Sequence, residues 1–585
     1  MSAQGLSGYL QNTCRFPLLQ KDVNIIWKIQ MFFISLHPKS ENSNIMAPKR
    51  KYPVGIQSFE SIRMDGYVYV DKTPLIYKMI TEGKPYFLNR PRRFGKSLLC
   101  STLEAVFQGR RELFESFTVK GGIEQPQLYI ATTDWEWDKY PVIRLDFSRK
   151  RSYDTEALKK LIDNNLRQYE EEYGIETTET DGSTRFERIV LETHRQTGRR
   201  AVVIVDEYDA FMLHSIGDYE QEKVIRSMFA DLFGPLKWLD DHLQFVFITG
   251  ISKFSQMGIF STLNNLKNIS MLPNYEALCG ITEEELTTQL RPDIELLAEK
   301  RGETFEETYA ELKRRYDGYH FCEEKTDIYN PFSLFNALDS GRIKDYWFDS
   351  ATPSAVIEML SNMPPLSLTD IERVNCPAER FDVPFNSYED PLPVLFQSGY
   401  LTIKDYRSDR NSYTLGLPNA EVRQGFANSL YQHVVSAKGI DKNRNALQQA
   451  YYDFFDYDDL SAFIEAIKAF FAGIPYHLAS KVEDAQETGK AEYHYHVILY
   501  TLLVAFGADI RIEEPTAKGR SDMVLKMPKG IYVMELKVDD TAENALTQIN
   551  QRGYAEKYLN DGRPITKVGM SFSSSERNIT GWVMG

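Results

Sequence analysis

Two carboxylates and a lysine near the C-terminus are residue types that can act on a phosphodiester. Asp522 is followed by Glu535, and Lys537 comes two residues after Glu535. Carboxylate oxygens are the ligands that hard divalent cations such as Mg²⁺ prefer. A bound cation lowers the pKa of a coordinated water and stabilises the charge that develops on the phosphate. The two carboxylates can therefore hold a divalent cation beside a phosphodiester, with the lysine next to them.

A β-hairpin must position these side chains. Its strand, turn and strand are predicted over residues 521–526, 527–530 and 531–538. The four-residue turn would pair Lys526 with Ile531. That register places Asp522 opposite Glu535, and Lys537 then shares the face of Glu535, because strand side chains alternate with period two. A slip of one residue would put the two carboxylates on opposite faces of the hairpin. The alternative is a surface hairpin with ordinary charges.

Two helices flank this hairpin in the sequence. Residues 491–506 have the period of an amphipathic helix, with Glu492 and His496 at the start of its mostly apolar face. Such a start is unusual for core packing, although a helix N-terminus tolerates Glu well. A second helix is expected to begin near Ala545 and to carry Gln548 and Tyr554 nearly two turns apart.

The residues of this region resemble the PD-(D/E)XK nuclease superfamily. The resemblance covers about residues 480–585 and rests on Glu492, Asp522, Glu535-x-Lys537 and Gln548 with Tyr554. It implies that Asp522, Glu535 and Glu492 bind Mg²⁺ and that Lys537 positions or activates the attacking water. Asp522, Glu535 and Lys537 would then be the catalytic residues. The family's Pro-Asp is Ser521-Asp522 here, a substitution that family members often show.

A phosphate-binding motif lies far upstream. A strand at 84–89, a loop at 90–97 and a helix at 98–107 follow one another. The P-loop template has Gly at both ends of its first six positions, then Lys and Ser or Thr. Gly95, Lys96 and Ser97 satisfy its second half, whereas Arg90 replaces the first Gly. Backbone amides at the helix start would still cradle phosphate, with Lys96 on the β- and γ-oxygens and Ser97 on Mg²⁺.

An acidic pair after a buried strand supports this prediction. Residues 201–205 are apolar and mostly β-branched, which is typical of a parallel strand covered on both faces. In a Walker B arrangement, Asp206 would order Mg²⁺ and Glu207 would polarise the attacking water. Another strand, at 243–249, is followed by Gly250-Ile251-Ser252, and Thr249 and Ser252 are candidate sensors of the γ-phosphate. An α/β domain whose strands merely end in polar residues is the alternative.

Motifs along most of the chain extend the resemblance. They are Tyr-Val-Asp-Lys-Thr at 69–73, the loop at 90–97, Asp-Glu-Tyr-Asp at 206–209, Tyr-Asp-Gly-Tyr at 316–319, Tyr-Asn-Pro-Phe-Ser at 329–333 and Gly-Tyr-Leu-Thr at 399–402. Over about residues 50–585 the chain resembles the bacterial AAA-ATPase-like family that carries a C-terminal PD-(D/E)XK domain.

The resemblance also specifies a nucleotide site. It implies ATP and Mg²⁺ as cofactors, with nucleotide contacts from Arg92, Arg93, Phe94, Gly95, Lys96, Ser97, Asp206 and Thr249. In this family the first P-loop Gly is commonly Arg, as at Arg90. An Arg-rich loop is compatible with tight binding and slow hydrolysis, and solvated surface charge is the alternative for Arg90, Arg92 and Arg93.

Length and composition predict an α/β multidomain protein. A chain of 585 residues is too long for one core, and about three to four domains are expected. The predicted parts are an AAA-like P-loop core with a parallel sheet at 46–280, a helical lid at 281–345, a connector at 346–450 with a winged-helix-like fold as one candidate, and a PD-(D/E)XK nuclease-like α/β domain at 451–585. Thr282 is expected to cap the first lid helix. Arg423 is expected in a salt bridge at a domain interface, with a nucleotide contact as the alternative.

The N-terminus and the cysteines bear on processing and location. Residues 1–45 are expected to be a non-native or disordered extension, with Met46 as the physiological start. Their apolar run is too short to span a bilayer and lacks a clean cleavage site. Five scattered cysteines without metal-ligand spacing favour reduced thiols in the cytoplasm. No membrane association is expected.

The charge balance bears on partners and function. A net charge of −15 argues against a simple DNA-binding protein, since nucleic-acid binding normally needs a positive face. We still expect nucleic acid as the partner, with DNA favoured, bound through local patches, a second protein or a homo-oligomer. The leading hypothesis is an ATP-binding and ATP-hydrolysing protein coupled to a Mg²⁺-dependent nuclease. The alternative is a nucleotide-dependent switch or scaffold whose nuclease-like domain binds nucleic acid or protein without cleavage.

Overall fold

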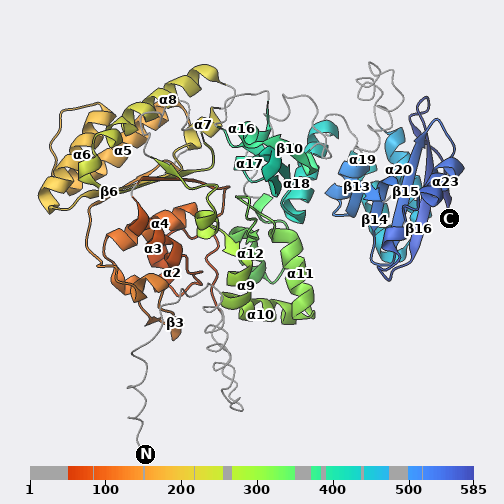
Figure 1. The fold of residues 1–585 in the computed structure, drawn as a ribbon, viewed down its shortest axis with the longest axis horizontal. Helices are drawn as coiled ribbons and strands as arrows, with labels where there is room; N and C mark the ends of the chain where they lie inside the picture. The colour runs from red at the N-terminus through yellow and green to blue at the C-terminus, as the bar shows by residue number, and fades with distance from the viewer. Residues whose placement is uncertain are drawn as a thin grey trace, which may run out of the picture. The chain divides into compact units, whose positions relative to one another are not determined.

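Figure 1 shows the fold in a computed structural model. The structure describes residues 50–83, 85–148, 152–215, 218–253, 266–348, 371–383, 390–435, 441–473, 499–516 and 518–585. The expected extension at 1–45, the candidate start Met46 and the helix residues Glu492 and His496 lie outside these ranges. No helix within them is both long enough and apolar enough to cross a membrane.

A five-stranded parallel sheet forms the core of the N-terminal part. Its order is β4–β5–β6–β1–β7, with β1 at Pro85–Asn89, β4 at Val142–Asp146, β5 at Ala201–Asp206, β6 at Leu243–Gly250 and β7 at Lys267–Asn268. Every residue of β5 is buried. Its β-branched sequence suits a strand with both faces covered. The predicted parallel-sheet core is therefore confirmed.

Helices lie on both sides of this sheet (Figure 1). On one side are α2 (Phe59–Met64), α3 (Thr73–Glu82) and α4 (Lys96–Phe107), and on the other are α5 (Thr155–Glu172), α6 (Gly182–Thr197) and α8 (Tyr219–Phe233). Strand β6 separates β5 from β1 and pairs with both in parallel. The loop after β1 and the acids after β5 therefore emerge at the same edge of the sheet, where open α/β sheets bind ligands.

Four helices follow the core, as predicted for the lid region. They are α9 (Glu283–Gln289), α10 (Arg291–Arg301), α11 (Phe305–Tyr316) and α12 (Pro331–Ser340). Thr282 caps α9: its hydroxyl accepts from the backbone N–H of Glu285 at 3.2 Å, and the Glu285 carboxylate accepts from the N–H of Thr282 at 2.8 Å. This reciprocal pair satisfies two otherwise unpaired helix donors, and the predicted N-cap is confirmed.

The connector region contains a small antiparallel sheet and helices. The sheet order is β10–β12–β11, with β10 at Val374–Pro377, β11 at Thr402–Arg407 and β12 at Ser412–Gly416, and the helices include α17 (Leu392–Gln397) and α18 (Ala420–Val435). Arg423 of α18 forms an ion pair of 2.7 Å with Glu372 and donates to the carbonyl of Ile510. The ion pair lies within the predicted connector, and the hydrogen bond to Ile510 is the contact that reaches the C-terminal region. Arg423 does not line the cavity in front of the loop at 90–97.

The C-terminal region is a second sheet with helices. Its order is β13–β14–β15–β16–β17, with β13 at Asp509–Thr516, β14 at Gly519–Lys526, β15 at Ile531–Val538, β16 at Ile565–Ser573 and β17 at Asn578–Met584. Its helices include α19 (Asp441–Tyr457), α20 (Leu460–Ala472) and α23 (Ala542–Arg552). Only β15 and β16 pair in parallel, and α23 lies between them in the sequence.

The register of the β14–β15 hairpin is the one predicted. Lys526 pairs with Ile531, and the pairing continues to Met523 opposite Met534. The next positions along the two strands are Asp522 and Glu535. Strand β13 was not predicted, and α23 ends before Tyr554, because Gly553 stops it in a left-handed conformation with φ of 63°.

Candidate nucleotide and nuclease sites

The loop after β1 has the backbone geometry of a phosphate cradle. It leads from Asn89 into α4, whose N-cap is Gly95 with φ of 96°. Such a positive φ is readily adopted by glycine and strains other residues. The unpaired N–H groups and positive dipole end of a helix attract anions. The turn at Gly95 therefore lets the N-terminus of α4, with Lys96 and Ser97, face the space in front of the loop.

A cavity of about 540 Å³ opens in front of this loop. Its lining includes Arg92, Arg93, Gly95, Lys96, Ser97 and Glu207, six of the residues predicted for the nucleotide site. Its other walls come from the segment at 53–57, from Tyr153 and His214, and from Phe332 and Phe335 of α12. The structure thus brings the loop, the acid after β5 and the α12 helix to one cavity.

Lys96 and Glu207 contact each other in this cavity. The Nζ of Lys96 lies 3.3 Å from Oε1 of Glu207 and donates to the carbonyl of Pro91 at 3.1 Å. Glu207 has φ of 53°, a left-handed conformation that is strained for a residue with a side chain. Such strain costs about 1–3 kcal/mol and is concentrated at functional sites. The strained turn sets the Glu207 carboxylate beside the lysine rather than along the strand.

Asp206 lies behind Glu207 at the end of β5. It is 1% exposed, and Arg144 lies 3.4 Å from its Oδ2. Burial, followed by the nearby charge of Glu207, raises the pKa of Asp206 to about 6, while Arg144 and Ser97 act in the opposite direction. Its Oδ1 is buried and makes no hydrogen bond within the described residues. A buried carboxylate oxygen without a donor, next to a serine hydroxyl, fits a Mg²⁺ ligand set.

Arg90 has a structural place that the sequence did not reveal. It is 1% exposed, so the surface-charge alternative is wrong for this residue. Its guanidinium donates to the carbonyls of Asn89, Ser270, Tyr275 and Glu276 and lies 4.1 Å from the ring centre of Phe321. Arg90 therefore fastens the start of the loop to the chain at 270–276 and does not face the cavity.

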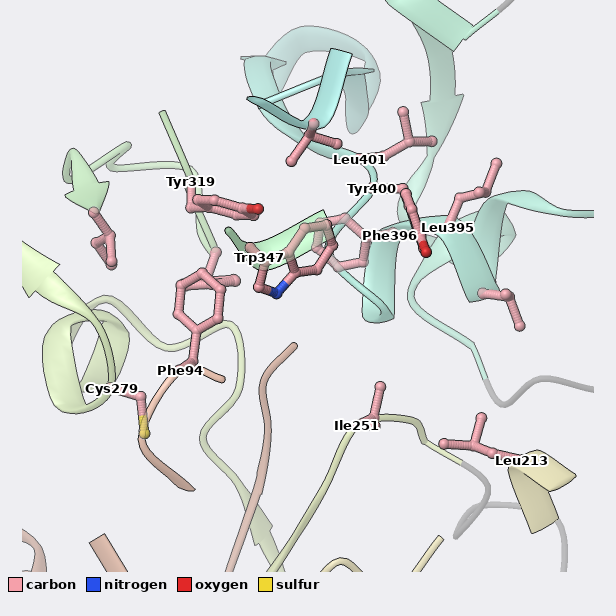
Figure 2. Close-up of a cluster of buried hydrophobic side chains, with 14 of the residues drawn as sticks. Phe94, Leu213, Ile251, Cys279, Tyr319, Trp347, Leu395, Phe396, Tyr400 and Leu401 are labelled. Carbon is pink, nitrogen blue, oxygen red and sulfur yellow. The ribbon is translucent and has the colours of Figure 1, made fainter. Parts of the chain in front are cut away.

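Three of the nucleotide contacts that the resemblance implies do not line this cavity: Asp206, which lies behind Glu207, and the two residues Phe94 and Thr249. The Phe94 side chain is 1% exposed and packs edge-on against Tyr319, with ring centres 4.8 Å apart (Figure 2). The hydroxyl of Thr249 is buried and donates to the carbonyl of Leu88 at 2.7 Å. Phe94 is therefore an anchor for the loop, and Thr249 holds β6 against β1. The predicted nucleotide contacts of the Phe94 and Thr249 side chains with the main cavity are therefore corrected to structural roles.

The structure also shows cavity residues that sequence reasoning missed. Tyr153 and His214 stack with ring centres 3.7 Å apart, and both line the cavity. Burial, with a smaller effect of Arg92, lowers the pKa of His214, so the ring stays neutral over more of the acidic range. These residues lie far apart in the sequence and follow no motif. Phe332 does lie in the Tyr-Asn-Pro-Phe-Ser motif, which was the available signal.

The second site lies on the β14–β15 hairpin and α23. Glu535 is fully buried; its Oε2 accepts from the N–H of Asp522 at 3.3 Å, and the Nζ of Lys537 lies 3.7 Å from its Oε1. Gln548 of α23 donates to the same Oε1 and lies 3.4 Å from the hydroxyl of Tyr554. The structure therefore gathers Asp522, Glu535 and Lys537, with Gln548 holding Glu535 from the helix side.

The donor set of the hairpin fits a divalent cation in part. Asp522 Oδ2 accepts from the N–H of Leu536 at 2.8 Å, which fixes one carboxylate beside the other. Two carboxylates are a hard-cation donor pair. Within the described ranges, no group of three or more His, Cys, Asp and Glu residues gathers as a ligand set. The third predicted ligand, Glu492, lies outside those ranges.

The fold and the sites together define a class of protein. A parallel sheet with a P-loop-like turn is followed in the same chain by a mixed sheet that carries an Asp–Glu-x-Lys hairpin. A family model described as "Predicted AAA-ATPase" matches residues 53–260, and that of the PD-(D/E)XK nuclease superfamily matches residues 490–582.

One relative matches this chain over most of its length. A protein of Azotobacter chroococcum mcd 1, described as an uncharacterized protein in the vnfD 5′ region, is 32% identical over 545 residues. The match covers 92% of this chain and 99% of that relative. The chain belongs to the AAA-ATPase-like family with a C-terminal PD-(D/E)XK nuclease superfamily domain, as its motifs predicted.

Proposed function

We propose that this protein binds and hydrolyses ATP and that a Mg²⁺-dependent nuclease in the same chain acts on nucleic acid. The observation that carries the proposal is the convergence of Lys96, Ser97 and Glu207 on one cavity, with the unpaired oxygen of Asp206 behind them. A lysine, a helix N-terminus and an acid around one space of nucleotide size, with a second acid buried behind them, are what a P-loop nucleotide site requires.

Each cavity residue has a role in this proposal. Lys96 binds the β- and γ-phosphates, Ser97 and Asp206 hold Mg²⁺, and Glu207 orients the attacking water. Arg92 and Arg93 add positive charge at the loop. A smaller apolar cavity of about 70 Å³ shares the walls Pro53, Gly95, Leu98, Pro331 and Phe335 with the main one. Phe94, which does not line the main cavity, lines this smaller one, and we propose that the smaller cavity receives the flat face of a base.

The nuclease proposal assigns roles on the hairpin. Asp522 and Glu535, with Glu492, would hold Mg²⁺, which when bound supplies a water of lowered pKa and neutralises charge on the phosphate. Lys537 would orient the attacking water beside Glu535. Gln548 keeps the Glu535 carboxylate in place through its donated hydrogen bond. We propose DNA as the preferred polymer and the cytoplasm as the location, and the four buried free cysteines of the described residues support a reducing compartment.

Cleavage is tested on single- and double-stranded DNA and RNA, with Mg²⁺ or Mn²⁺, with and without ATP. Asp522→Ala should abolish cleavage. Asp456→Ala is the matched control, since this exposed aspartate of α19 lies in the same C-terminal region. Undiminished cleavage by Asp522→Ala, or no cleavage by the wild type under any of these conditions, would reject the nuclease assignment.

Nucleotide binding is tested separately by calorimetry. Lys96→Ala should weaken ATP binding by tenfold or more, because a charge-assisted hydrogen bond contributes about 1.5–3 kcal/mol. Lys78→Ala on α3 is the control, because that lysine is partly exposed and 4.0 Å from Glu82. Unchanged affinity in Lys96→Ala would remove the P-loop assignment.

One observation favours a second candidate function, a nucleotide-dependent switch or scaffold without cleavage. Both oxygens of Glu535 already accept hydrogen bonds from protein groups, Oε1 from Gln548 and Oε2 from Asp522. Because both oxygens of Glu535 have hydrogen-bond donors, this carboxylate does not need a metal, and the domain could bind nucleic acid or a protein partner without one. Retained nucleic-acid binding by a wild type that does not cleave, with ATP-dependent affinity, would establish this alternative.

A further inference from the structure

The first turn of helix α18 contacts two segments that lie next to the P-loop. Glu421 is 1% exposed, and its Oε1 accepts from the backbone N–H groups of Tyr346 at 2.5 Å and Trp347 at 2.7 Å. Its Oε2 accepts from the hydroxyl of Ser333 at 2.7 Å. Three donors from two separate segments therefore converge on one buried carboxylate.

Both of those segments touch the P-loop. The indole Nε1 of Trp347 donates to the carbonyl of Arg92 at 2.9 Å. Trp347 is buried among aromatic side chains, with its ring centre 5.5 Å from that of Tyr400 (Figure 2). Ser333 neighbours Phe332, which lines the cavity and lies 4.8 Å beneath the guanidinium of Arg93. Glu421 is therefore connected to Arg92 through Trp347, and to Arg93 through the segment of Phe332 and Ser333.

The opposite side of α18 contacts the C-terminal sheet region. Arg423 donates to Glu372 at 2.7 Å, to the hydroxyl of Tyr500 and to the carbonyl of Ile510 at 2.7 Å. Ile510 belongs to β13, where it pairs with Leu525 of β14. Strand β14 also carries Asp522, three residues earlier, so Arg423 is one strand away from the candidate nuclease site.

Helix geometry explains why the two sets of contacts do not interfere. Residues two positions apart on an α-helix point to nearly opposite faces and differ in height by about 3 Å. Glu421 and Arg423 therefore face opposite directions from the same rigid turn. A Cβ on Gly425, one turn further on, would lie 2.2 Å from the ring of Phe348, so the helix backbone packs directly on the segment that carries Trp347.

We propose that α18 transmits nucleotide occupancy of the cavity to β13 and β14, and so regulates the nuclease site. The proposal rests on the proposed function, because it needs a nucleotide in the cavity. The path runs from the Arg92 carbonyl through Trp347 to Glu421, and from Arg423 to Ile510. A shift of the P-loop on nucleotide binding moves α18 as a body and changes the support of the strand that carries Asp522.

Two variants interrupt the path at different points. Trp347→Phe removes the indole N–H that bonds to Arg92, together with the five-membered ring that carries it, and keeps a six-membered aromatic ring in the core. Arg423→Met removes the three donated hydrogen bonds and keeps an unbranched side chain. Trp238→Phe is the matched control, because the Nε1 of this exposed tryptophan donates to Glu187 of α6, away from the path.

The experiment measures amide hydrogen exchange of Asp509–Thr516 in the full chain, with and without a saturating non-hydrolysable ATP analogue and Mg²⁺. Coupling between sites commonly amounts to about fivefold or more. We expect the analogue to change exchange of these amides by such a factor in the wild type and in Trp238→Phe. In Trp347→Phe and Arg423→Met the change should fall to less than twofold, while calorimetry still shows nucleotide binding.

The outcomes separate this proposal from the proposed function. Absence of nucleotide binding in the wild type rejects the proposed function and this coupling with it. Nucleotide binding without any change in β13, or an equal change in Trp347→Phe and the wild type, overturns the coupling and leaves the ATP site standing. If Arg423→Met does not fold, Trp347→Phe decides the matter alone. The readout does not require cleavage, so it also applies to a nuclease-inactive protein.

Discussion

Arg90 provides the sharpest test of how this P-loop is built. The general template has glycine at this position, and a template-based view expects Arg90→Gly to be neutral or to improve phosphate binding. The structure leads to the opposite expectation. Arg90 is 1% exposed, and its two terminal nitrogens supply all the hydrogen bonds described above to four carbonyl oxygens.

The magnitude follows from those contacts. A net contribution of about 1 kcal/mol for each hydrogen bond gives about 4 kcal/mol for the four, and removing the side chain also leaves a cavity beside Phe321. Burial lowers the pKa of Arg90 to about 10, so the guanidinium is still charged at neutral pH. We expect Arg90→Gly to lower the stability of the P-loop region by about 4 kcal/mol.

The assay is thermal unfolding of the full chain, combined with nucleotide calorimetry at a temperature below the transition. About 2–4 °C per kcal/mol is typical for a domain of this size, so the first transition should fall by about 8–16 °C. Several domains unfold in one chain, so only that first transition is interpreted. Arg92→Ala is the control, since its side chain lines the cavity and should lower affinity with little change in stability. A stable Arg90→Gly protein that has lost nucleotide binding would refute this reasoning.

Three further predictions address the loop and the two acid sites. Gly399→Ala should lower the unfolding temperature and weaken nucleotide binding in calorimetry, because φ is 86° and the new Cβ would lie 2.7 Å from Pro91. The raised pKa of Asp206, about 6, means that Mg²⁺-dependent nucleotide affinity should fall as pH decreases from 7 to 5, and this slope should be absent in Asp206→Asn. The free energy of unfolding without metal has the opposite pH dependence. The folded protein binds the Asp206 proton up to about pH 6, whereas the unfolded chain has already lost it, so the stability of the metal-free protein falls as pH rises towards 6. Gln548→Ala should raise the Mg²⁺ concentration needed for half-maximal cleavage more than it lowers the maximal rate, because Gln548 only holds Glu535, and a metal titration checks this.

The hairpin and the acid-bearing strand were predictable because local sequence determines them. A four-residue turn between two alternating segments leaves few registers, and the observed pairing of Lys526 with Ile531 follows from it. Strand β13 was missed because an edge strand need not be apolar, and residues 509–516 are mostly charged or polar with a proline.

Contacts between distant segments account for the mispredicted site residues. Thr249 lies in a strand that is buried on both faces, so no alternation indicates which side chain meets the cavity. Arg90 is charged and would ordinarily be placed at the surface. Its carbonyl partners at Ser270, Tyr275 and Glu276 are about 180 residues away in the sequence. No local pattern encodes that pairing, and only the fold supplies it.

Both candidate sites share one electrostatic arrangement. Lys96 lies 3.3 Å from Glu207 in the cavity, and Lys537 lies 3.7 Å from Glu535 on the hairpin. In each site two carboxylates lie close together and repel each other, Asp206 and Glu207 in one and Asp522 and Glu535 in the other. The positive charge of the lysine reduces this repulsion. In the proposed function the carboxylates would hold a divalent cation, and Lys96 and Lys537 would turn to the phosphate. Under the proposed function, that exchange would keep each site close to electrical balance, which is how a chain with a net charge of −15 would receive a phosphate at these two places.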